Sequence, residues 1–266
     1  MKYYEVAEAK DMAGLRLVLT AYVPGPWGES AKKIFDYKNI PYIPVAQHAA
    51  KANEDLVAWT GIRNAPNAMY ENEAPRTSWY DILMLAERLA PERPLLPQRS
   101  EERALVLGIC SEICSEWGFG WARRAMMGTP YAGPVDPVRA ASLSKPFWDP
   151  EDAVRMRQAY SASVGGPAEA PARCADIVRM LAARLHRQKA EGSEYLVGYA
   201  PTACDIYWMV FSMALDPLPH EVNPMPDWMR MSYDMIGPVL EAAKDPILMA
   251  HRDMMYERHS KLPLEF

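Results

Sequence analysis

The stretch that most constrains the fold runs from Arg63 to Pro97 and reads RNAPNAMYENEAPRTSWYDILMLAERLAPERPLLP. Its first part predicts two short strands, over residues 67–70 and 74–77, joined by a turn. Ser78 then opens a helix, and prolines shortly after its last apolar residue end it. The apolar residues of this helix recur at three- and four-residue spacing: Trp79, Ile82, Leu83, Leu85, Ala86 and Leu89. The stretch therefore predicts a β-hairpin that leads directly into a helix start.

Two positions in this stretch indicate a ligand. Ser78 stands where an N-cap belongs, so its hydroxyl and the first backbone N–H groups lie at the positive end of the helix dipole. Such a helix start binds carboxylates, although a serine can also serve as a cap alone. A cis bond before Pro66 would expose the backbone of Ala65 to a ligand. Together these features predict a peptide-binding site.

The Ala65-Pro66 step before a hairpin, the serine at the next helix start and the final Pro-Leu-Leu-Pro run resemble the N-terminal domain of the glutathione S-transferase superfamily. That family usually has an acidic residue before the cap serine, where this chain has Thr77. The resemblance implies that Ala65, Pro66, Thr77 and Ser78 bind glutathione as a co-substrate. It also implies an α+β two-domain fold, with an N-terminal thioredoxin-like α/β domain and a C-terminal all-α helical domain.

The residues before this stretch independently predict the order of strands and helices that a thioredoxin-like domain requires. Residues 15–22 predict a buried strand and residues 23–27 a loop, because two prolines and a glycine interrupt any regular element there. A helix from Gly28 to about residue 39, a strand over residues 40–45 and a short helix over residues 53–60 follow. Strand, helix, strand, helix, hairpin and helix is a thioredoxin-like order.

Beyond Pro97 the pattern becomes helical. The domain boundaries expected are a leader or tail over residues 1–14, a glutathione-binding domain over residues 15–97 and an all-helical domain over residues 98–266. Ser100 is expected to cap the first helix of the last domain. Helices are predicted over residues 100–127, 151–161 and 171–190, an irregular connection over residues 128–150, and at least two more helices between residues 225 and 266.

The strongest local signal in the second half is Thr202-x-x-Asp205, which predicts a capping box. The helix that follows, to about Leu215, is apolar almost all round and should lie in the middle of its domain. The same pattern resembles the buried helix start of the family's C-terminal domain, so its role is structural. Replacing Asp205 by alanine should cost roughly 1–2 kcal/mol through lost capping.

Composition excludes several partners. The formal net charge is −5, and no basic face is apparent, which argues against a nucleic-acid partner. No apolar run is long enough to span a bilayer, and the first residues are too charged for a signal peptide. The sequence therefore predicts a cytoplasmic protein with no membrane partner.

Cysteines and histidines give no sign of a metal or redox site. The cysteines lie in helical patterns, where core packing competes with any redox role, and the histidines are scattered without ligand spacing. We therefore expect reduced thiols and no metal. The residues are Cys110, Cys114, Cys174 and Cys204, and His48, His186, His220, His251 and His259.

The resemblance also raises the question of which group activates the glutathione thiol. Family members with a catalytic serine or cysteine have it before the proline at the first helix start, where this chain has Gly25. Tyr22, near the position of the catalytic hydroxyl in tyrosine-type members, and Ser30 are the candidate donors. Backbone N–H groups, or no activation at all, remain alternatives.

A second substrate would need an apolar pocket. Aromatic and methionine side chains after Ser100 could line it with Trp27, or could instead pack between domains or subunits: Trp117, Phe119, Trp121, Met126 and Met127. The function predicted is a glutathione S-transferase-like enzyme in which the glutathione thiolate attacks a hydrophobic electrophile. The alternative is a non-catalytic binding or assembly module of the same fold. The resemblance further implies a homodimer.

Overall fold

The fold was obtained from a computed structural model, which describes residues 1–127, 132 and 166–266. The chain forms two compact units. The first comprises Met1–Leu95 together with Leu264–Phe266, and the second comprises Leu96–Pro263.

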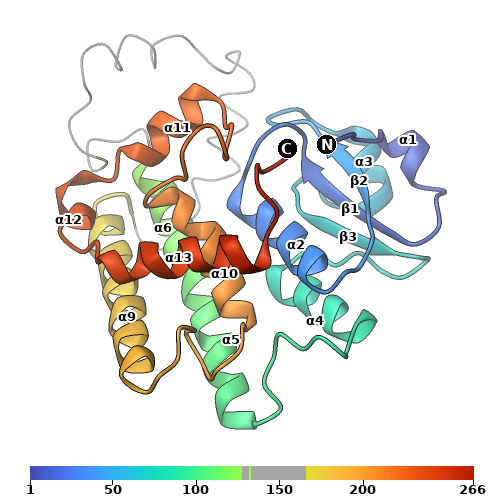
Figure 1. The fold of residues 1–266 in the computed structure, drawn as a ribbon. Coiled ribbons are helices and arrows are strands. Elements are labelled where there is room, and N and C mark those ends of the chain that lie inside the picture. The colour runs from blue at the N-terminus through green and yellow to red at the C-terminus, as the bar shows by residue number, and fades with distance from the viewer. Residues whose placement is uncertain (128–131, 133–165) are drawn as a thin grey trace. The chain divides into compact units, whose positions relative to one another are not determined.

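A three-stranded sheet forms the centre of the first unit (Figure 1). Strand β1 (Leu15–Thr20) lies between β2 (Ile43–Gln47), with which it is parallel, and β3 (Asn67–Tyr70), with which it is antiparallel. Helix α2 (Pro26–Tyr37) connects β1 to β2, α3 (Glu54–Thr60) connects β2 to β3, and α4 (Trp79–Leu89) follows. This mixed sheet confirms the thioredoxin-like fold predicted for the N-terminal domain.

Helices pack on both faces of the sheet. On one face, Val18 and Val45 form a buried cluster with residues of α3 and of α1 (Val6–Ala9): Val6, Ala9 and Leu56. On the other face, α2 approaches closely enough that a Cβ on Gly28 would lie 3.4 Å from Leu19 Cδ2. Because alternate residues of β1 point to opposite faces, its continuous apolar run is explained by burial on both sides.

The leader is part of the first unit. Tyr4 makes a parallel bridge with Val45, in which the Tyr4 N–H donates to the Pro44 carbonyl over 2.9 Å. The Ala46 N–H donates to the Tyr4 carbonyl, also over 2.9 Å. The leader thus covers the outer edge of β2, an edge that would otherwise present unpaired backbone groups.

The predicted hairpin is only partly formed. Residues 74–77 are not a strand, because their pairing is limited to a single antiparallel bridge between Ala68 and Arg76. The chain turns back early, through the Glu73 N–H bond to the Tyr70 carbonyl, and Pro75 has no N–H with which to extend the ladder. The helix predicted to begin at Gly28 begins instead at Pro26, since proline is well accepted at the first helical position.

The last three residues of the chain, residues 264–266, belong to the first unit. Lys32 on α2 binds both carboxylate oxygens of Glu29, over 2.8 and 3.1 Å, and the Glu265 carbonyl over 2.5 Å. The Lys32 ammonium also lies 5.2 Å from the centre of the Phe266 ring, and the Met1 amino group lies 3.7 Å from the Glu265 carboxylate. Residues 264–266 are therefore held on α2 by a buried ion pair.

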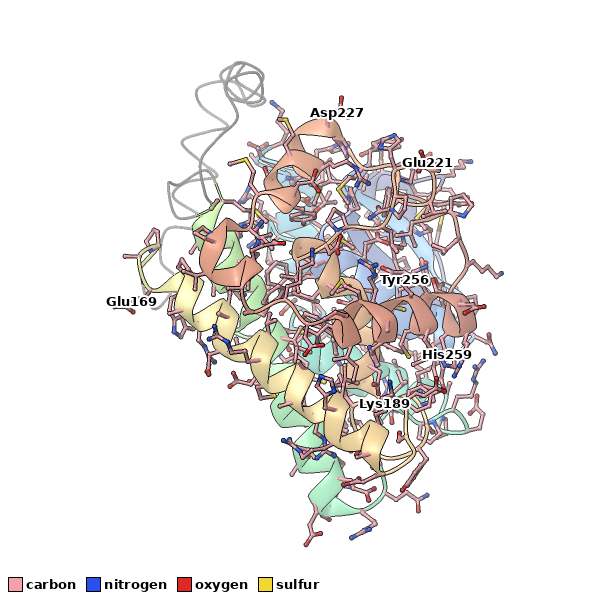
Figure 2. The ribbon with its side chains drawn as sticks, turned by 60° about the vertical axis from the view of Figure 1, so that its left-hand side comes forward. Glu169, Lys189, Glu221, Asp227, Tyr256 and His259 are labelled. Carbon is pink, nitrogen blue, oxygen red and sulfur yellow. The ribbon has the colours of Figure 1, made fainter. Side chains whose placement is uncertain are left out.

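The second unit is helical throughout its described part. Its elements are α5 (Ser100–Cys114), α6 (Phe119–Met126), α9 (Ala170–Ala190), α10 (Ala203–Phe211), the 3₁₀ turn η2 (Ser212–Ala214), α11 (Asp227–Asp234), α12 (Gly237–Glu241) and α13 (Pro246–His259). Figure 2 follows α9 from Glu169 to Lys189 and shows Tyr256 and His259 on α13. These helices confirm the all-helical domain and the helices expected after residue 225. The connection expected over residues 128–150 and the helix expected over residues 151–161 lie outside the described residues, apart from Ala132.

The single long helix predicted from residue 100 to 127 is wrong, because the chain breaks between α5 and α6. Trp117 has a φ of 61°, and a Cβ on Gly118 would lie 2.7 Å from the Glu112 carbonyl oxygen. Only glycine fits that approach. Ser100 is also the first helical residue rather than the cap, which is Arg99.

Helix α10 forms the core of the second unit, as its apolar sequence predicts. All of its residues are buried, and Trp208 packs edge to face against Phe119 of α6 with ring centres 5.6 Å apart. A search of the described helices finds none with the length and apolar character needed to cross a membrane.

Candidate functional site

The sheet topology of the first unit brings three connections to one edge. Because β1 and β2 are parallel, their carboxyl ends lie at the same edge, and the antiparallel β3 begins there. The connections are residues 21–25 after β1, residues 48–53 after β2 and residues 61–66 before β3. We call this the carboxyl edge. Ligands of open α/β sheets commonly bind outside such an edge.

Ala65 places an unused stretch of backbone at the carboxyl edge. Within the described part of the chain, neither its N–H nor its carbonyl makes a hydrogen bond. The following Ala65–Pro66 bond is cis. Ala65 and Pro66 are partly exposed, so a ligand backbone can pair with Ala65 as an added strand pairs with a sheet edge.

The start of α4 lies beside this backbone. The bridge between Ala68 and Arg76 runs antiparallel, with both backbone bonds 2.9 Å long, so residues 65–67 approach residues 77–79 as the two segments continue. The structure thus brings together four of the predicted ligand-binding residues: Ala65, Pro66, Thr77 and Ser78.

Ser78 caps α4 as predicted. Its Oγ accepts from the Asp81 N–H over 3.0 Å and donates to Asp81 Oδ2 over 2.7 Å. The Asp81 side chain is exposed, and Thr77 is exposed as well. The helix start therefore presents a hydroxyl, first-turn N–H groups and an exposed carboxylate side by side. A zwitterionic amino-acid head group needs a donor set for its carboxylate and an acceptor for its ammonium, and this helix start offers both.

The start of α2 lies at the same edge and has no side chain at its cap. Gly25 is the N-cap residue, Pro26 the first helical residue and Trp27 the second, with Trp27 partly exposed. Ser30 is 1% exposed, and its hydroxyl donates to the Trp27 carbonyl over 3.0 Å. The hydroxyl of Ser30 is therefore already engaged within the helix, whereas the dipole of α2 directs its positive end toward the carboxyl edge.

Tyr22 stands at the end of β1 in an unusual conformation. It has a φ of 62° and is 66% exposed. Its ring packs edge to face against Tyr3 of the leader, with centres 5.4 Å apart, and the Tyr3 hydroxyl lies within reach of the Tyr22 backbone N–H. A bulky residue at positive φ is uncommon, and such conformations gather at functional sites.

Sequence reasoning missed several polar groups at the carboxyl edge. Gln47 and Asn67 are buried, and the oxygens Gln47 Oε1 and Asn67 Oδ1 have no hydrogen-bond partner among the described residues. Both oxygens are buried acceptors that the described residues leave unpaired at this edge. Their positions could not be found without the strand register. Asp81 could have been found, since Ser78 and Asp81 form a hydroxyl-x-x-acid pattern like that of Thr202 and Asp205.

The other predicted site residues belong to the second unit. Trp117 lies at the break between α5 and α6, and Trp121 lies in the first turn of α6, where both are partly exposed.

The cysteines are free and buried, and burial raises the pKa values of Cys110, Cys114 and Cys204 well above the usual range. Low-pKa thiols react and high-pKa thiols do not, so these side chains behave as core residues.

Asp205 confirms the capping box and extends it. Its Oδ2 accepts from the Thr202 N–H over 2.8 Å and from the Thr202 hydroxyl over 2.7 Å. Its Oδ1 accepts from the Leu196 N–H over 2.7 Å and from His251 Nε2 over 2.9 Å. Asp205 is fully buried, so all of this capacity serves the fold. The described residues contain no group of three or more His, Cys, Asp or Glu side chains placed as metal ligands.

Known structures share this fold across nearly the whole chain. A β-etherase from Sphingobium sp. strain SYK-6 is 18% identical, with 92% of this chain and 96% of the other covered and a TM-score of 0.60. A glutathione transferase family member from Pseudomonas fluorescens, solved with two glutathione bound, is 12% identical, with 95% and 94% covered and a TM-score of 0.60. A rice GST in complex with glutathione is 16% identical, with 95% and 93% covered and a TM-score of 0.60. No protein-family model and no curated protein sequence matches the chain. The structural likenesses establish the fold.

Proposed function

We propose that this chain, which has the glutathione S-transferase fold, binds glutathione at the carboxyl edge of its first unit and joins the glutathione sulfur to a hydrophobic electrophile. The observation that carries the proposal is the unused backbone of Ala65 beside the start of α4. Solved structures of the same fold contain glutathione, which supports the choice of this tripeptide.

The γ-glutamyl head group is the part of glutathione that suits the start of α4. Its carboxylate would take the first-turn N–H groups and the partly exposed Ser78 hydroxyl, which would turn toward it from Asp81 Oδ2. Its ammonium would take the exposed carboxylate of Asp81, which supplies the acid that Thr77 lacks. The cysteinyl backbone would then pair with Ala65, ahead of Pro66. Each part of the ligand thus meets a group of opposite hydrogen-bonding character.

Activation of the thiol needs preferential stabilisation of the thiolate. Lowering a thiol pKa from about 8.5 by about two units requires roughly 2.7 kcal/mol. A single neutral hydrogen bond contributes about 1 kcal/mol. We therefore assign the task to two groups together, the Tyr22 hydroxyl as donor and the positive end of α2. Ser30 is the weaker candidate because its hydroxyl already binds the Trp27 carbonyl.

The reaction proposed is a nucleophilic substitution or addition. The thiol proton leaves to solvent, the thiolate sulfur forms a bond to the electrophilic carbon, and the electron pair displaced goes to a leaving group or into the acceptor. Trp27, partly exposed at the start of α2, is proposed to contact the electrophile at the carboxyl edge. Aromatic side chains favour a flat apolar substrate.

Gly25 supports a second candidate function, that of a non-catalytic module. That residue caps α2 without a side chain, so the chain lacks the hydroxyl or thiol that many members of the fold use. A binding or assembly module without thiol activation would keep the Ala65 and Ser78 contacts and lose the chemistry. Purified protein that conjugates chlorodinitrobenzene, with Tyr22→Phe greatly slowed, favours the enzyme. Glutathione binding without conjugation favours the module.

We further propose a homodimer and a cytoplasmic location. Tyr80 and Met84 lie four residues apart on α4 and are 43% and 39% exposed, which supports a second copy as partner. Sedimentation equilibrium of the full chain checks the dimer, and Met84→Lys should shift it toward monomer. The net charge of −5 supports a partner other than nucleic acid.

Calorimetric titration of glutathione into the wild-type protein and Ser78→Ala tests the site. Binding should weaken by about 1.5–3 kcal/mol in the variant, the worth of a hydrogen bond to a charged group. Ser100→Ala is the matched control, because Ser100 also lies at a helix start but in the second unit. It should leave binding unchanged. No binding to the wild-type protein would contradict the proposal, and equal weakening in both variants would contradict the assignment of Ser78.

A further inference from the structure

Tyr22 is held in a backbone conformation that it would not adopt by itself. A φ of 62° places it in the left-handed region, where the Cβ of every residue but glycine is crowded by the backbone. Such a conformation persists only where the surrounding structure determines it.

The core of the first unit does not hold the Tyr22 side chain, because that residue is 66% exposed. Local backbone bonds shape the turn, with the Val23 N–H donating to the Thr20 carbonyl over 3.2 Å. The ring rests on Tyr3, at 5.4 Å between centres and an angle of 68° between planes. The Tyr3 hydroxyl also lies within reach of the Tyr22 backbone N–H. Tyr3 thus supports Tyr22 through its ring, with its hydroxyl beside the Tyr22 backbone.

Tyr3 can serve as a support because the leader itself is fixed. The next residue, Tyr4, is tied to β2 by two backbone bonds of 2.9 Å. Two residues of α1, Val6 and Ala9, are buried against the sheet and α3. Ahead of Tyr3, the amino group of Met1 lies 3.7 Å from the Glu265 carboxylate. The leader is therefore attached on both sides of Tyr3.

The protonation state of Tyr3 suits a support rather than a reactant. Burial and the nearby carboxylate of Glu29 raise the pKa of Tyr3 to about 12. Its hydroxyl accordingly stays protonated at neutral pH, and it keeps the same hydrogen-bonding character while the thiol ionises. Tyr3 therefore keeps a constant charge during the reaction, which suits a residue that supports Tyr22, the proposed donor to the sulfur.

We propose that Tyr3 is a positioning residue for thiol activation, holding Tyr22 and the loop that leads into α2 so that the donor hydroxyl and the helix start face the glutathione sulfur. This inference rests on the proposed function, because it needs glutathione at the carboxyl edge. It assigns a role to the leader, residues 1–14, which lies before the part of the chain that resembles the family.

The test measures the pKa of the glutathione thiol bound to the protein, from the ultraviolet absorbance of the thiolate as pH is varied. Tyr3→Phe keeps the ring and removes the hydroxyl, and it should raise the bound-thiol pKa by about one unit, a roughly tenfold loss of thiolate at neutral pH. kcat for chlorodinitrobenzene should fall by the same factor, with KM for glutathione nearly unchanged. Tyr4→Phe, in the next residue of the leader, keeps its backbone bonds to β2 and should match the wild type.

The possible results distinguish a positioning role for Tyr3 from a purely structural one. A Tyr3→Phe variant with wild-type thiol pKa and kcat overturns the positioning role, while Tyr22→Phe raising the same pKa would leave the proposed function standing. Parallel loss in Tyr3→Phe and Tyr4→Phe means that the leader acts only through stability and also overturns the role. A wild-type protein that does not bind glutathione overturns both this inference and the proposed function.

Discussion

The starts of α4 and α10 carry the same four-residue pattern, a hydroxyl residue followed three positions later by aspartate, and use it differently. At α4, Ser78 and Asp81 bond to each other and the Asp81 carboxylate faces solvent. At α10, Asp205 is fully buried and accepts four hydrogen bonds from the protein itself. The pattern therefore determines the local cap, while burial determines whether the acid remains exposed to a ligand.

The largest effect should follow Asp205→Ala. Capping alone is worth about 1–2 kcal/mol, but the buried acid also satisfies Leu196 and His251. Their donors would be left buried without an acceptor, so we expect a loss of roughly 3–5 kcal/mol. Urea unfolding measures the loss, and hydrogen exchange of the α10 amides locates it in the second unit. A loss no larger than about 2 kcal/mol would mean that the bonds to Leu196 and His251 add nothing to a simple cap.

An intermediate effect should appear at the exposed acid, and in binding rather than in folding. Asp81→Asn removes the charge proposed to hold the ammonium of glutathione, and affinity should fall by about 1.5–3 kcal/mol. The sharper measurement repeats the titration with a glutathione analogue that lacks the α-amino group. The variant and the wild type should bind this analogue equally. If the analogue also binds the variant more weakly, Asp81 acts only by shaping the helix start.

The smallest effect should be the loss of stability in the same Asp81→Asn variant. An exposed acid in the first turn contributes about 0.3–1 kcal/mol through the helix dipole, and the asparagine amide can still bond to Ser78. The midpoint of urea unfolding for the first unit should therefore shift only slightly. A loss as large as that of Asp205→Ala would remove the contrast between the two helix starts.

Local patterns predicted the caps of α4 and α10 well, because the partners of a cap lie within three residues. The cap of α13 is equally local, since Asp245 accepts from the Ile247 N–H over 3.0 Å, next to a proline at the first helical position. The thioredoxin-like order also followed from the sequence, since each strand and helix carries its own period.

Features that depend on contacts beyond the three-residue span of a cap were not predicted. The break before α6 depends on the approach of Gly118 to the Glu112 carbonyl, which no residue type announces. The pairing of Tyr4 with β2 depends on a neighbour some forty residues away in sequence, and the contact of Tyr3 with Tyr22 depends on that pairing. At the candidate site, the sequence indicated Ala65 and Ser78 but not the buried oxygens of Gln47 and Asn67.

Residues 264–266 belong to the first unit although the whole of the second unit precedes them in the chain. The ribosome therefore synthesises the first unit as two separate segments, Met1–Leu95 and Leu264–Phe266. Lys32 is already in place with Glu29, but the carbonyl of Glu265 that it also binds is synthesised more than two hundred residues later. Domains usually fold in the order in which they emerge, yet here the first can be completed only after the second has been translated.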